Sequence, residues 1–430
     1  MMKNYFLLVL IIFPFLFLNT LFGKTIFTID ECIEIALKNK SSVKIAALRV
    51  ESSRAEVKGS LSNILPTLSY SSGFLNQGSY YSRQFGFPIE GRQYYSSTFS
   101  ISQPVFDGGK WRNSITLVKN RYTSSKRSYS ETVVEIALNV KKAFYQYLKD
   151  KELLEVTRQA VELAEQQFEF VRHQFEIEAV ARTDLLKQQV QLGNMKVDFI
   201  NQKAQVKNSF NQLAYIMGFD IHSEFDVIDA GSSVSNEKAA EELWQDMKNN
   251  NQSLLSQKLN IESAGIFYRL SKSSLYPTIS ALFSYDGSSD KLDDLYSNFN
   301  EDWRYSARVS VSYPLFSGFE RSSEIEKAKL DVQIQQEDYD DLEKNLRVQL
   351  DAIIEQLNNL KKKIPIYKSN KISADEDLRL ALERYNLGAA TILDVLDAQL
   401  SGARANSSLV HAVYDEKIWM AELDALLGKY

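Results

Sequence analysis

The chain has 430 residues, of which 44% are hydrophobic and 24% are charged. Its 50 basic and 55 acidic side chains nearly balance, so the formal net charge of −5 gives no reason to expect a nucleic-acid partner. A single cysteine, Cys32, excludes an intrachain disulfide. Because it lies well past the N-terminal apolar run, we predict a buried helix residue rather than a lipid-modified N-terminus.

The N-terminus has the layout of a secretory signal peptide. Lys3 precedes an almost unbroken apolar run from Tyr5 to Phe22, which ends near Gly23. A short basic segment before such a run is typical of export signals, and a retained transmembrane anchor is the alternative. We therefore predict a signal peptide over residues 1–23.

The remaining sequence is a tandem duplication. Four short motifs recur in the same order at an offset of 210 or 211 residues: LPTLS at 65–69 and YPTIS at 276–280, QPVFDG at 103–108 and YPLFSG at 313–318, TDLL at 183–186 and LDVL at 393–396, LAYIMG at 213–218 and LDALLG at 423–428. Repetition at one spacing indicates two copies of one structural unit. We predict repeats over residues 24–218 and 239–430, joined by a polar linker at 219–238.

Each repeat reads as a helix, two strands, a long helix and a shorter helix. The first helix is predicted from Thr28, a capping residue with Glu31 three positions later, to Asn63, before Pro66 stops it. Strands are predicted where the period switches to two, with an aromatic and a hydroxyl-rich side: 67–75, 94–103, 278–285 and 304–313. Long polar loops at 76–93 and 286–303 join them. A membrane barrel needs such two-sided strands, although a soluble sandwich strand alternates in the same way.

The long helices carry the pattern of a coiled coil. From Val133 every seventh residue is apolar or aromatic: Val133, Val140, Tyr147, Leu154, Val161, Phe168 and Phe175. A stripe held at period seven specifies left-handed packing against a neighbouring helix. A helix over 110–175 would run about 100 Å. Its counterpart, 321–387, contains Pro365, which should bend it. The shorter helices are predicted over 183–217 and 391–427.

The predicted fold class is mainly α with a small β part. Four strands per chain cannot close a barrel, yet open sheet edges are not tolerated in lipid, so other copies must supply the missing strands. Three copies would give a transmembrane β-barrel completed by trimerisation and, at the other end, a long coiled-coil α-helical barrel.

The chain resembles the TolC family of outer membrane efflux proteins over nearly its whole mature length. The resemblance rests on QPVFDGG at 103–109, YPLFSG at 313–318 and the helix turn YNLGAATILDVLD at 385–397. It implies a homotrimer in the outer membrane that extends into the periplasm. Such a trimer contacts membrane lipid and docks a periplasmic adaptor protein and an inner-membrane RND pump or ABC transporter. It implies a passive exit duct for efflux or type I secretion, with no cofactor.

The resemblance also implies a gate at the periplasmic mouth. Asp394 and Asp397 match two aspartates that form a ring around the axis. Six carboxylates in one constriction would raise their own pKa values by mutual repulsion and would make the pore prefer cations. In the alternative, Asp394 only forms a helix cap with Thr391.

Other matched positions lie at the two helical tips. Tyr385 matches a tyrosine that hydrogen-bonds an acid on the neighbouring tip, here Asp184, with Thr183 beside it; a solvated tyrosine is the alternative. Glu178, Gly388 and Thr391 match the positions expected to contact the adaptor. The chain departs from the pattern at two positions, because Glu178 replaces a glycine and Ala390 stands where some members carry an arginine that latches the mouth.

Two other classes of function are alternatives to an exit duct. An enzyme is disfavoured, because His173, His222 and His411 show no metal spacing and no phosphate-binding glycine loop is present. An exported structural or adhesive coiled coil would explain the heptads. It leaves the paired two-sided strands unexplained. The sequence does not indicate the cargo.

Overall fold

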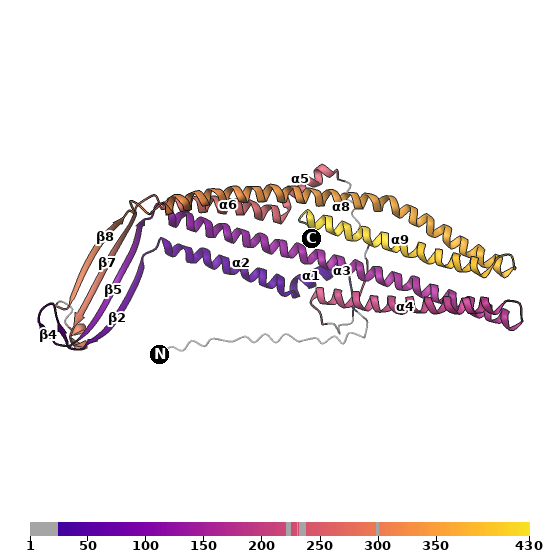
Figure 1. The fold of residues 1–430 in the computed structure, drawn as a ribbon, viewed down its shortest axis with the longest axis horizontal. Helices are drawn as coiled ribbons and strands as arrows, with labels where there is room; N and C mark the ends of the chain where they lie inside the picture. Colours follow the sequence, from indigo (N-terminus) through magenta and orange to yellow (C-terminus); the bar gives the residue numbers. More distant parts are fainter. Residues whose placement is uncertain (1–24, 221–224, 230, 232–237, 298–300) are drawn as a thin grey trace, which may run out of the picture.

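The computed structural model describes residues 25–220, 225–229, 231, 238–297 and 301–430. The predicted signal peptide, residues 1–23, lies outside these ranges. The chain forms a long helical body with a four-stranded sheet at one end and two helical hairpin turns at the other (Figure 1). Among the described residues, no helix is both long and apolar enough to cross a membrane.

Both repeats contain the predicted elements. The first runs through β1 (Thr25–Phe27), α1 (Ile29–Asn39), α2 (Ser41–Ser60), a 3-10 turn (Leu61–Asn63), β2 (Thr67–Gln77), β3 (Tyr80–Ser82), β4 (Phe87–Ile89), β5 (Arg92–Phe106), α3 (Lys110–Glu176) and α4 (Arg182–Met217). The second follows with β6 (Phe225–Val227), α5 (Ala240–Asn250), α6 (Gln252–Ser273), β7 (Thr278–Ser289), α7 (Leu292–Ser297), β8 (Trp303–Ser312), α8 (Glu320–Asn386) and α9 (Ile392–Leu426). The two long helices, α3 and α8, have 67 residues each, so each spans about 100 Å.

The prediction of one continuous helix over 28–63 was wrong. Thr28 does cap the helix, in a capping box with Glu31. However, Lys40 adopts an extended backbone conformation and separates α1 from α2. The break lets α1 end against α4. The two helices approach so closely there that a Cβ atom added to Gly218 would lie 2.8 Å from the Cβ atom of Asn39. Asn251 makes the same break between α5 and α6 in the second repeat.

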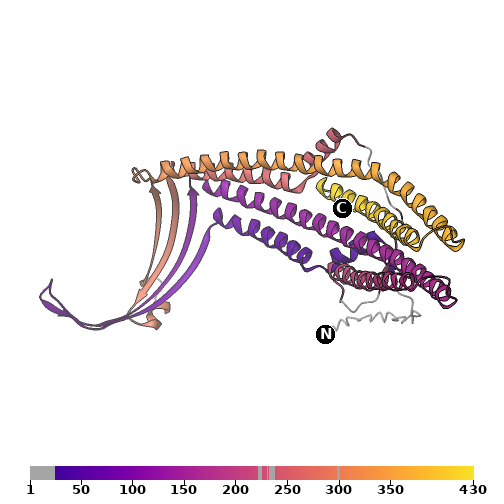
Figure 2. The ribbon, with the colours of Figure 1, turned by 45° about the vertical axis from the view of Figure 1, so that its right-hand side comes forward.

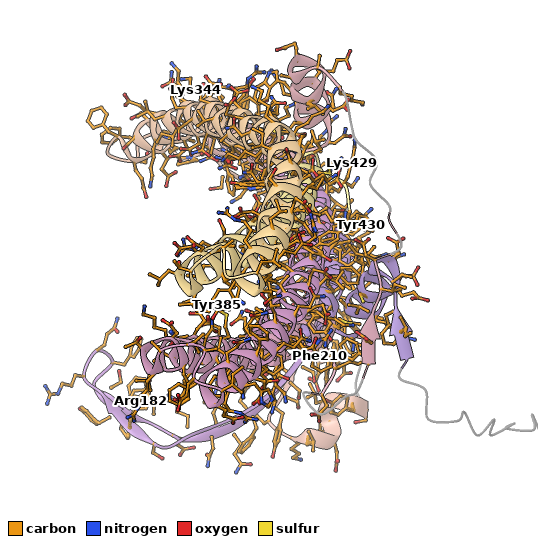
Figure 3. The ribbon with its side chains drawn as sticks, turned by 90° about the vertical axis from the view of Figure 1, so that its right-hand side faces the viewer. Arg182, Phe210, Lys344, Tyr385, Lys429 and Tyr430 are labelled. Atoms are coloured by element: carbon orange, nitrogen blue, oxygen red, sulfur yellow. The ribbon has the colours of Figure 1, made fainter. Side chains whose placement is uncertain are left out.

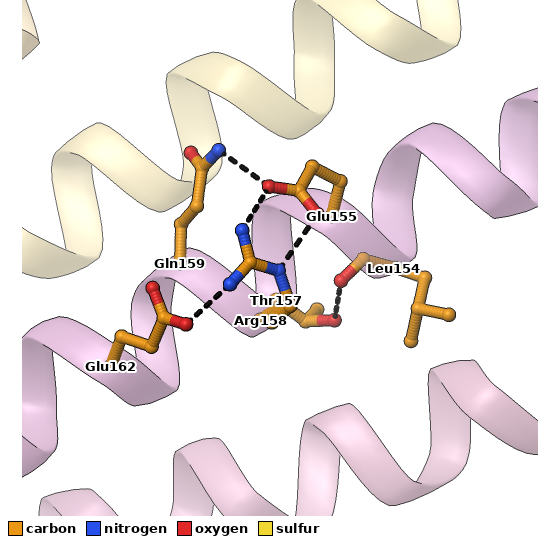
Figure 4. A network of polar contacts seen from close by, with 6 residues as sticks. All are labelled: Leu154, Glu155, Thr157, Arg158, Gln159 and Glu162. Carbon is orange, nitrogen blue, oxygen red and sulfur yellow. Dashed lines mark hydrogen bonds and ion pairs between the residues drawn. The ribbon is translucent and has the colours of Figure 1, made fainter.

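The heptad stripe of α3 faces the interior of the helical body. Val133, Val140 and Tyr147 are buried, and the later members of the stripe, toward the hairpin turn, are partly buried. The solvent side of the same helix is charged: Arg158 pairs with Glu155 and Glu162 (Figure 4). These bonds lower the pKa of Glu155 to about 2. Because both partners are exposed, such pairs mark a solvated helix face rather than a major source of stability.

Pro365 does not interrupt α8, which continues as one helix from Glu320 to Asn386. Figures 1 and 2 show that the helix is curved rather than straight, and that its second half bends before it reaches the α8–α9 hairpin turn. The helix therefore accommodates Pro365, which lacks a backbone N–H donor, by bending instead of ending.

Two hydrophobic cores lie in the middle of the helical body, one in each repeat. The first surrounds Phe144 and Leu213, and the second surrounds Met247 and Leu350. Cys32 belongs to the first core, as predicted, and burial raises the pKa of its thiol to about 12. The thiol is therefore protonated and unreactive at neutral pH.

The predicted linker at 219–238 includes an element that sequence analysis missed. Its strand β6 pairs in parallel with β1 beside the first core. Lys151 of α3 holds Asp226 of this strand at 2.8 Å, and Lys417 of α9 pairs with Asp229. The segment between the repeats is thus bound to both of them.

The sheet has the order β2-β5-β7-β8 and is antiparallel throughout. Its register places most of the aromatic and aliphatic side chains on one face, including Tyr70 opposite Phe99, Phe99 opposite Tyr285, and Tyr285 opposite Tyr305. The other face carries hydroxyl and charged groups, such as Ser69, Ser100, Ser284 and Arg308. Within the described residues, β2 and β8 each leave one edge unpaired.

The loops predicted at 76–93 and 286–303 contain secondary structure. The first carries the hairpin β3–β4 beyond the sheet. The second carries α7, which is held against the apolar face of the sheet because Trp303 donates its indole N–H to the carbonyl of Leu295 at 2.7 Å. The hydroxyl of Tyr296 in α7 also bonds Ser97 on β5 at 2.9 Å. These contacts join a helix to two strands of the sheet, and sequence periodicity does not report such contacts.

The core packing predicts a large effect of truncating Phe144, which is 1% exposed. Phe144→Ala should destabilise the fold by about 3–5 kcal/mol, because it removes a buried ring and leaves a cavity. The measurement is the thermal midpoint of the helical circular dichroism signal. Phe85→Ala, in the loop between β3 and β4, is the control, because Phe85 is 62% exposed. Equal midpoints for the two variants would contradict this description of the core.

Candidate functional site

The end of the molecule opposite the sheet consists of two helical hairpin turns, one between α3 and α4 and the other between α8 and α9. Seen from this end, the helices form an arc that runs from α8 through α9 to α3 and α4 (Figure 3). All the site residues predicted from the sequence lie on these turns or in the adjoining helical turns.

Both turns use the same backbone hydrogen bonds. In the first, Glu178 N–H donates to Phe175 and Ala179 N–H donates to Gln174; in the second, Gly388 and Ala389 donate to Tyr385 and Arg384. This pair of bonds is the Schellman motif, in which one residue adopts a left-handed conformation. Glu178 has φ of 60° and Gly388 has φ of 71°. Glu178 therefore holds a conformation that favours glycine.

Thr391 and Asp394 form a complete capping box at the start of α9. Thr391 donates its backbone N–H to Asp394 Oδ2 at 2.7 Å and its hydroxyl to the same oxygen at 2.8 Å. The backbone N–H of Asp394 donates to Thr391 Oγ1 at 3.3 Å. The bonds from Thr391, its backbone N–H first, hold the pKa of Asp394 below its ordinary value. The cap that sequence analysis raised as the alternative role of Asp394 is thus present in the single chain.

Asp397 lies one helical turn after Asp394, and both side chains are exposed. The first repeat carries no equivalent acidic pair, because Lys187 occupies the position that matches Asp397. Lys187 Nζ lies 4.0 Å from Asp184 Oδ1. The acidic pair one turn apart at the start of the last helix is therefore present in the second repeat and absent from the first.

Tyr385 and Asp184 come from different hairpins, and in the described part of the chain the hydrogen bond that the family resemblance implies between them is not formed. The hydroxyl of Tyr385 is buried and has no partner in the described part of the chain. Burial raises the pKa of Tyr385, and the charge of Asp184 adds to this shift. The ring of Tyr385 packs edge-on against Phe170 of α3, with ring centroids 6.2 Å apart. Thr183 is exposed and takes no part in this contact.

Several polar residues near the tips were missed by sequence analysis. Gln188 is fully buried, and Gln399 is 8% exposed. Each has a side-chain polar atom without a hydrogen-bond partner in the described residues. Gln188 shares its heptad position with Met195, Gln202 and Ser209, so the sequence carries no signal that marks it as buried. In the described ranges, no group of three His, Cys, Asp or Glu side chains could hold a metal ion; His222 lies outside them.

The strained conformation of Glu178 predicts that glycine would suit this turn better. Glu178→Gly should stabilise the α3–α4 turn by about 0.5–1 kcal/mol, because the strain removed exceeds the extra chain entropy of glycine. Gly388→Ala should loosen the α8–α9 turn for the reverse reason. Hydrogen exchange of the turn amides measures both effects. Slower exchange in Gly388→Ala, or faster exchange in Glu178→Gly, would contradict the prediction.

The capping box predicts how the start of α9 depends on pH. The folded-state pKa of Asp394 is depressed, so the cap stabilises α9 fully above the ordinary aspartate pKa and is lost as the pH falls through the depressed value. The protection factors of amides 392–395 should therefore fall only in strongly acidic solution. Thr391→Ala should lower them already at neutral pH and weaken the acid transition, because only the backbone N–H of residue 391 still bonds Asp394. An unchanged acid transition in this variant would show that another group caps the helix.

Known proteins share this architecture. The chain is 22% identical over 397 residues to the outer membrane protein TolC of Vibrio cholerae. This match covers 91% of the present chain and 89% of the Vibrio protein. It is 24% identical over 392 residues to the alkaline protease secretion protein AprF of Pseudomonas aeruginosa, covering 89% and 80% of the two chains. Its fold matches the crystal structure of a membrane protein from Pseudomonas aeruginosa with a TM-score of 0.84 at 17% identity, over 93% of this chain and 90% of that one.

The family model of outer membrane efflux proteins matches residues 32–219 and 243–429. These two segments cover most of the chain and contain both hairpin turns, the sheet and the long helices. The chain therefore belongs to the family of outer membrane efflux proteins.

Proposed function

We propose that three copies of this chain form a passive exit duct, with a barrel in the outer membrane and a helical tunnel in the periplasm. The observation that carries this proposal is the sheet, which has two chemically different faces and two unpaired edges. Each unpaired edge would leave backbone groups unsatisfied in lipid, so a membrane-embedded sheet must close on itself. Joining β2 of one copy to β8 of the next satisfies both edges.

The side chains of the sheet fit a water-filled barrel. The aromatic face carries large exposed apolar groups, among them Leu68, Tyr305 and Val309, which suits contact with lipid. On the other face Arg304 and Arg308 lie among serines, which suits a hydrated lumen. A sheet turned the other way would place two arginines in the hydrocarbon layer at a large energetic cost.

The helices support the same assembly. One side of α4 exposes Leu186, Val190, Val197 and Ile200, which follow heptad spacing with Gly193 between them. A heptad stripe left exposed in one chain indicates a helix of a neighbouring copy as its partner. The exit duct therefore contains one tunnel wall made of three arcs, each arc being the one visible in Figure 3.

The hairpin turns would form the periplasmic mouth. Asp394 and Asp397 of three copies would surround the axis, where mutual repulsion opposes the pKa-lowering effect of the cap on Asp394. The two roles are compatible, because the cap orients the Asp394 carboxylate. Tyr385, Asp184 and Thr183 would link neighbouring hairpins in the closed mouth. Glu178, Gly388 and Thr391, on the outermost turns, would contact the adaptor.

The proposed partners are a periplasmic adaptor and an inner-membrane RND pump or ABC transporter. One similar protein is named for protease secretion, whereas the family is named for efflux. Because related ducts serve such different cargo, we assign the choice of cargo to the pump. Catalysis has no support in a family of transport channels. The alternative, an exported structural or adhesive coiled coil, has no use for a sheet with one lipid-suited face.

The charge of the mouth is tested with Asp394→Asn and Asp397→Asn together. Asparagine keeps the size of the side chain and, at position 394, an amide oxygen that can accept the bonds from Thr391, so the change mainly removes charge. We expect block by a trivalent cation to need a much higher concentration and cation preference to fall, because cations gather where carboxylates do. Single-channel recording in planar bilayers measures both.

Asp198→Asn is the matched control, because Asp198 is an exposed acid on α4 away from the turns. It should leave cation block unchanged. If the double variant is blocked as readily as the parent, the two aspartates do not line the mouth.

A further inference from the structure

The charged side chains of the four-stranded sheet all lie on its hydroxyl-rich face. Within β2, β5, β7 and β8, every residue of which is described, the charged residues are Arg92, Asp286, Arg304 and Arg308. In each strand they alternate with the side chains of the apolar face, so the strand residues of that face carry no formal charge. Each copy of the chain therefore brings three arginines and one aspartate to the hydroxyl-rich face.

The aspartate of this face lies beside one of the arginines. Asp286 of β7 is directly opposite Arg304 of β8 in the register, so their Cα atoms are about 5 Å apart. Asp286 also accepts hydrogen bonds from the hydroxyls of Thr98 at 2.9 Å and Ser284 at 2.5 Å, which hold its carboxylate on the face. Opposite charges in facing positions attract, and from a distance their fields largely cancel.

Arg308, in contrast, has no acidic neighbour within the sheet. It lies opposite Leu282 of β7, and its diagonal neighbours on that strand are Ser280 and Ser284. Asp286 is four residues along β7 from Leu282, about 13 Å away, which exceeds the Debye length of about 8 Å at physiological ionic strength. On the open side of β8, the proposed neighbour is β2 of the next copy, and β2 contains no charged residue. The charge of Arg308 therefore stays uncompensated, whatever the register of that joint.

Hydroxyl groups surround Arg308, and its side chain is exposed. Ser306 and Ser310 flank it on the same face of β8, and Ser102 of β5 lies in the same row of the sheet. A guanidinium group donates hydrogen bonds in a planar fork that matches a carboxylate or a phosphate, and hydroxyls can donate further bonds to the same anion. The surroundings of Arg308 therefore suit an anion.

In a barrel of three copies, this charge would act across the whole lumen. Twelve strands about 4.8 Å apart and tilted by about 40° give a backbone radius of about 12 Å. Because the long side chain of arginine extends inward from this wall, its charge would lie within about one Debye length, about 8 Å, of the axis. Three such groups would affect every ion that passes.

We propose that three copies of Arg308 form an anion-preferring ring in the lumen of the barrel, so that the duct favours solutes that carry carboxylate or phosphate groups. This inference rests on the proposed function, and the preference adds to the choice of cargo by the pump. Its sign is opposite to that of the mouth, where Asp394 and Asp397 favour cations. The length of α3, about 100 Å, separates the two regions, so each acts on passing ions without screening the other.

The ring is tested with Arg308→Gln in single-channel recordings of the full-length protein in planar bilayers. Inorganic tripolyphosphate, added to each side in turn, is the probe, because its charged oxygens match the guanidinium fork. We expect the concentration that blocks half of the current to rise several-fold, and the reversal potential in a KCl gradient to shift toward cation preference. Arg308→Lys, which keeps the charge, should retain most of the block.

Asp286→Asn is the matched control, and its expected effect has the opposite sign. Asparagine keeps an oxygen that can accept the bonds from Thr98 and Ser284, whereas loss of the negative charge should strengthen the block by tripolyphosphate. A general disturbance of the sheet would move both variants in the same direction, so opposite shifts identify charge as the cause. Shifts in the same direction would overturn the ring.

The recordings also separate this inference from the proposed function. Conducting channels of Arg308→Gln that tripolyphosphate blocks as readily as the parent reject the ring alone. A protein that forms neither trimers nor channels rejects the proposed function, and the ring with it. Block by a trivalent cation at the mouth should be the same in Arg308→Gln as in the parent, and a changed cation block would contradict the separate action of the two regions.

Discussion

A β-strand at the edge of a sheet carries a row of backbone N–H and C=O groups that need partners wherever water is absent. In this chain the sheet leaves β2 and β8 open, and its large apolar side chains gather on one face. Neither feature is stable alone in lipid or in water. In the proposed duct these edges pair between copies of the chain, and this pairing links the sheet to the membrane.

The helical half of the molecule also has a surface that needs a partner. The heptad stripe of α3 is buried within the chain, whereas the stripe of α4 from Leu186 to Ile200 is left exposed. A wall of three arcs would cover these stripes and place the hairpin turns around one axis. The curvature of α8 through Pro365 brings its turn close to that of the first repeat, where Tyr385 meets Phe170.

Periodicity and internal repetition were sufficient to predict the long helices, the four main strands and the duplication, because each rests on local patterns. They did not predict the break at Lys40, since an extended residue between two helical segments leaves no proline or glycine signal. They also did not predict that β1 pairs with β6 or that Tyr296 of α7 bonds Ser97 of β5, because both contacts join segments distant in the sequence.

At the candidate site, the sequence was sufficient to predict the helix cap formed by Thr391 and Asp394, because a capping box involves only four consecutive residues. The roles of Asp397, Asp184 and Thr183 depend on neighbouring copies, so they stay predictions. The buried glutamines were not recognised, because a polar residue at one heptad position looks like tolerated variation until its burial is known.

The central claim is that one chain is incomplete and that three copies complete it. Native mass spectrometry of the protein extracted from outer membranes in detergent tests it most directly. The account predicts a single species with the mass of three mature chains. A stable monomer that remains soluble after removal of detergent would contradict it.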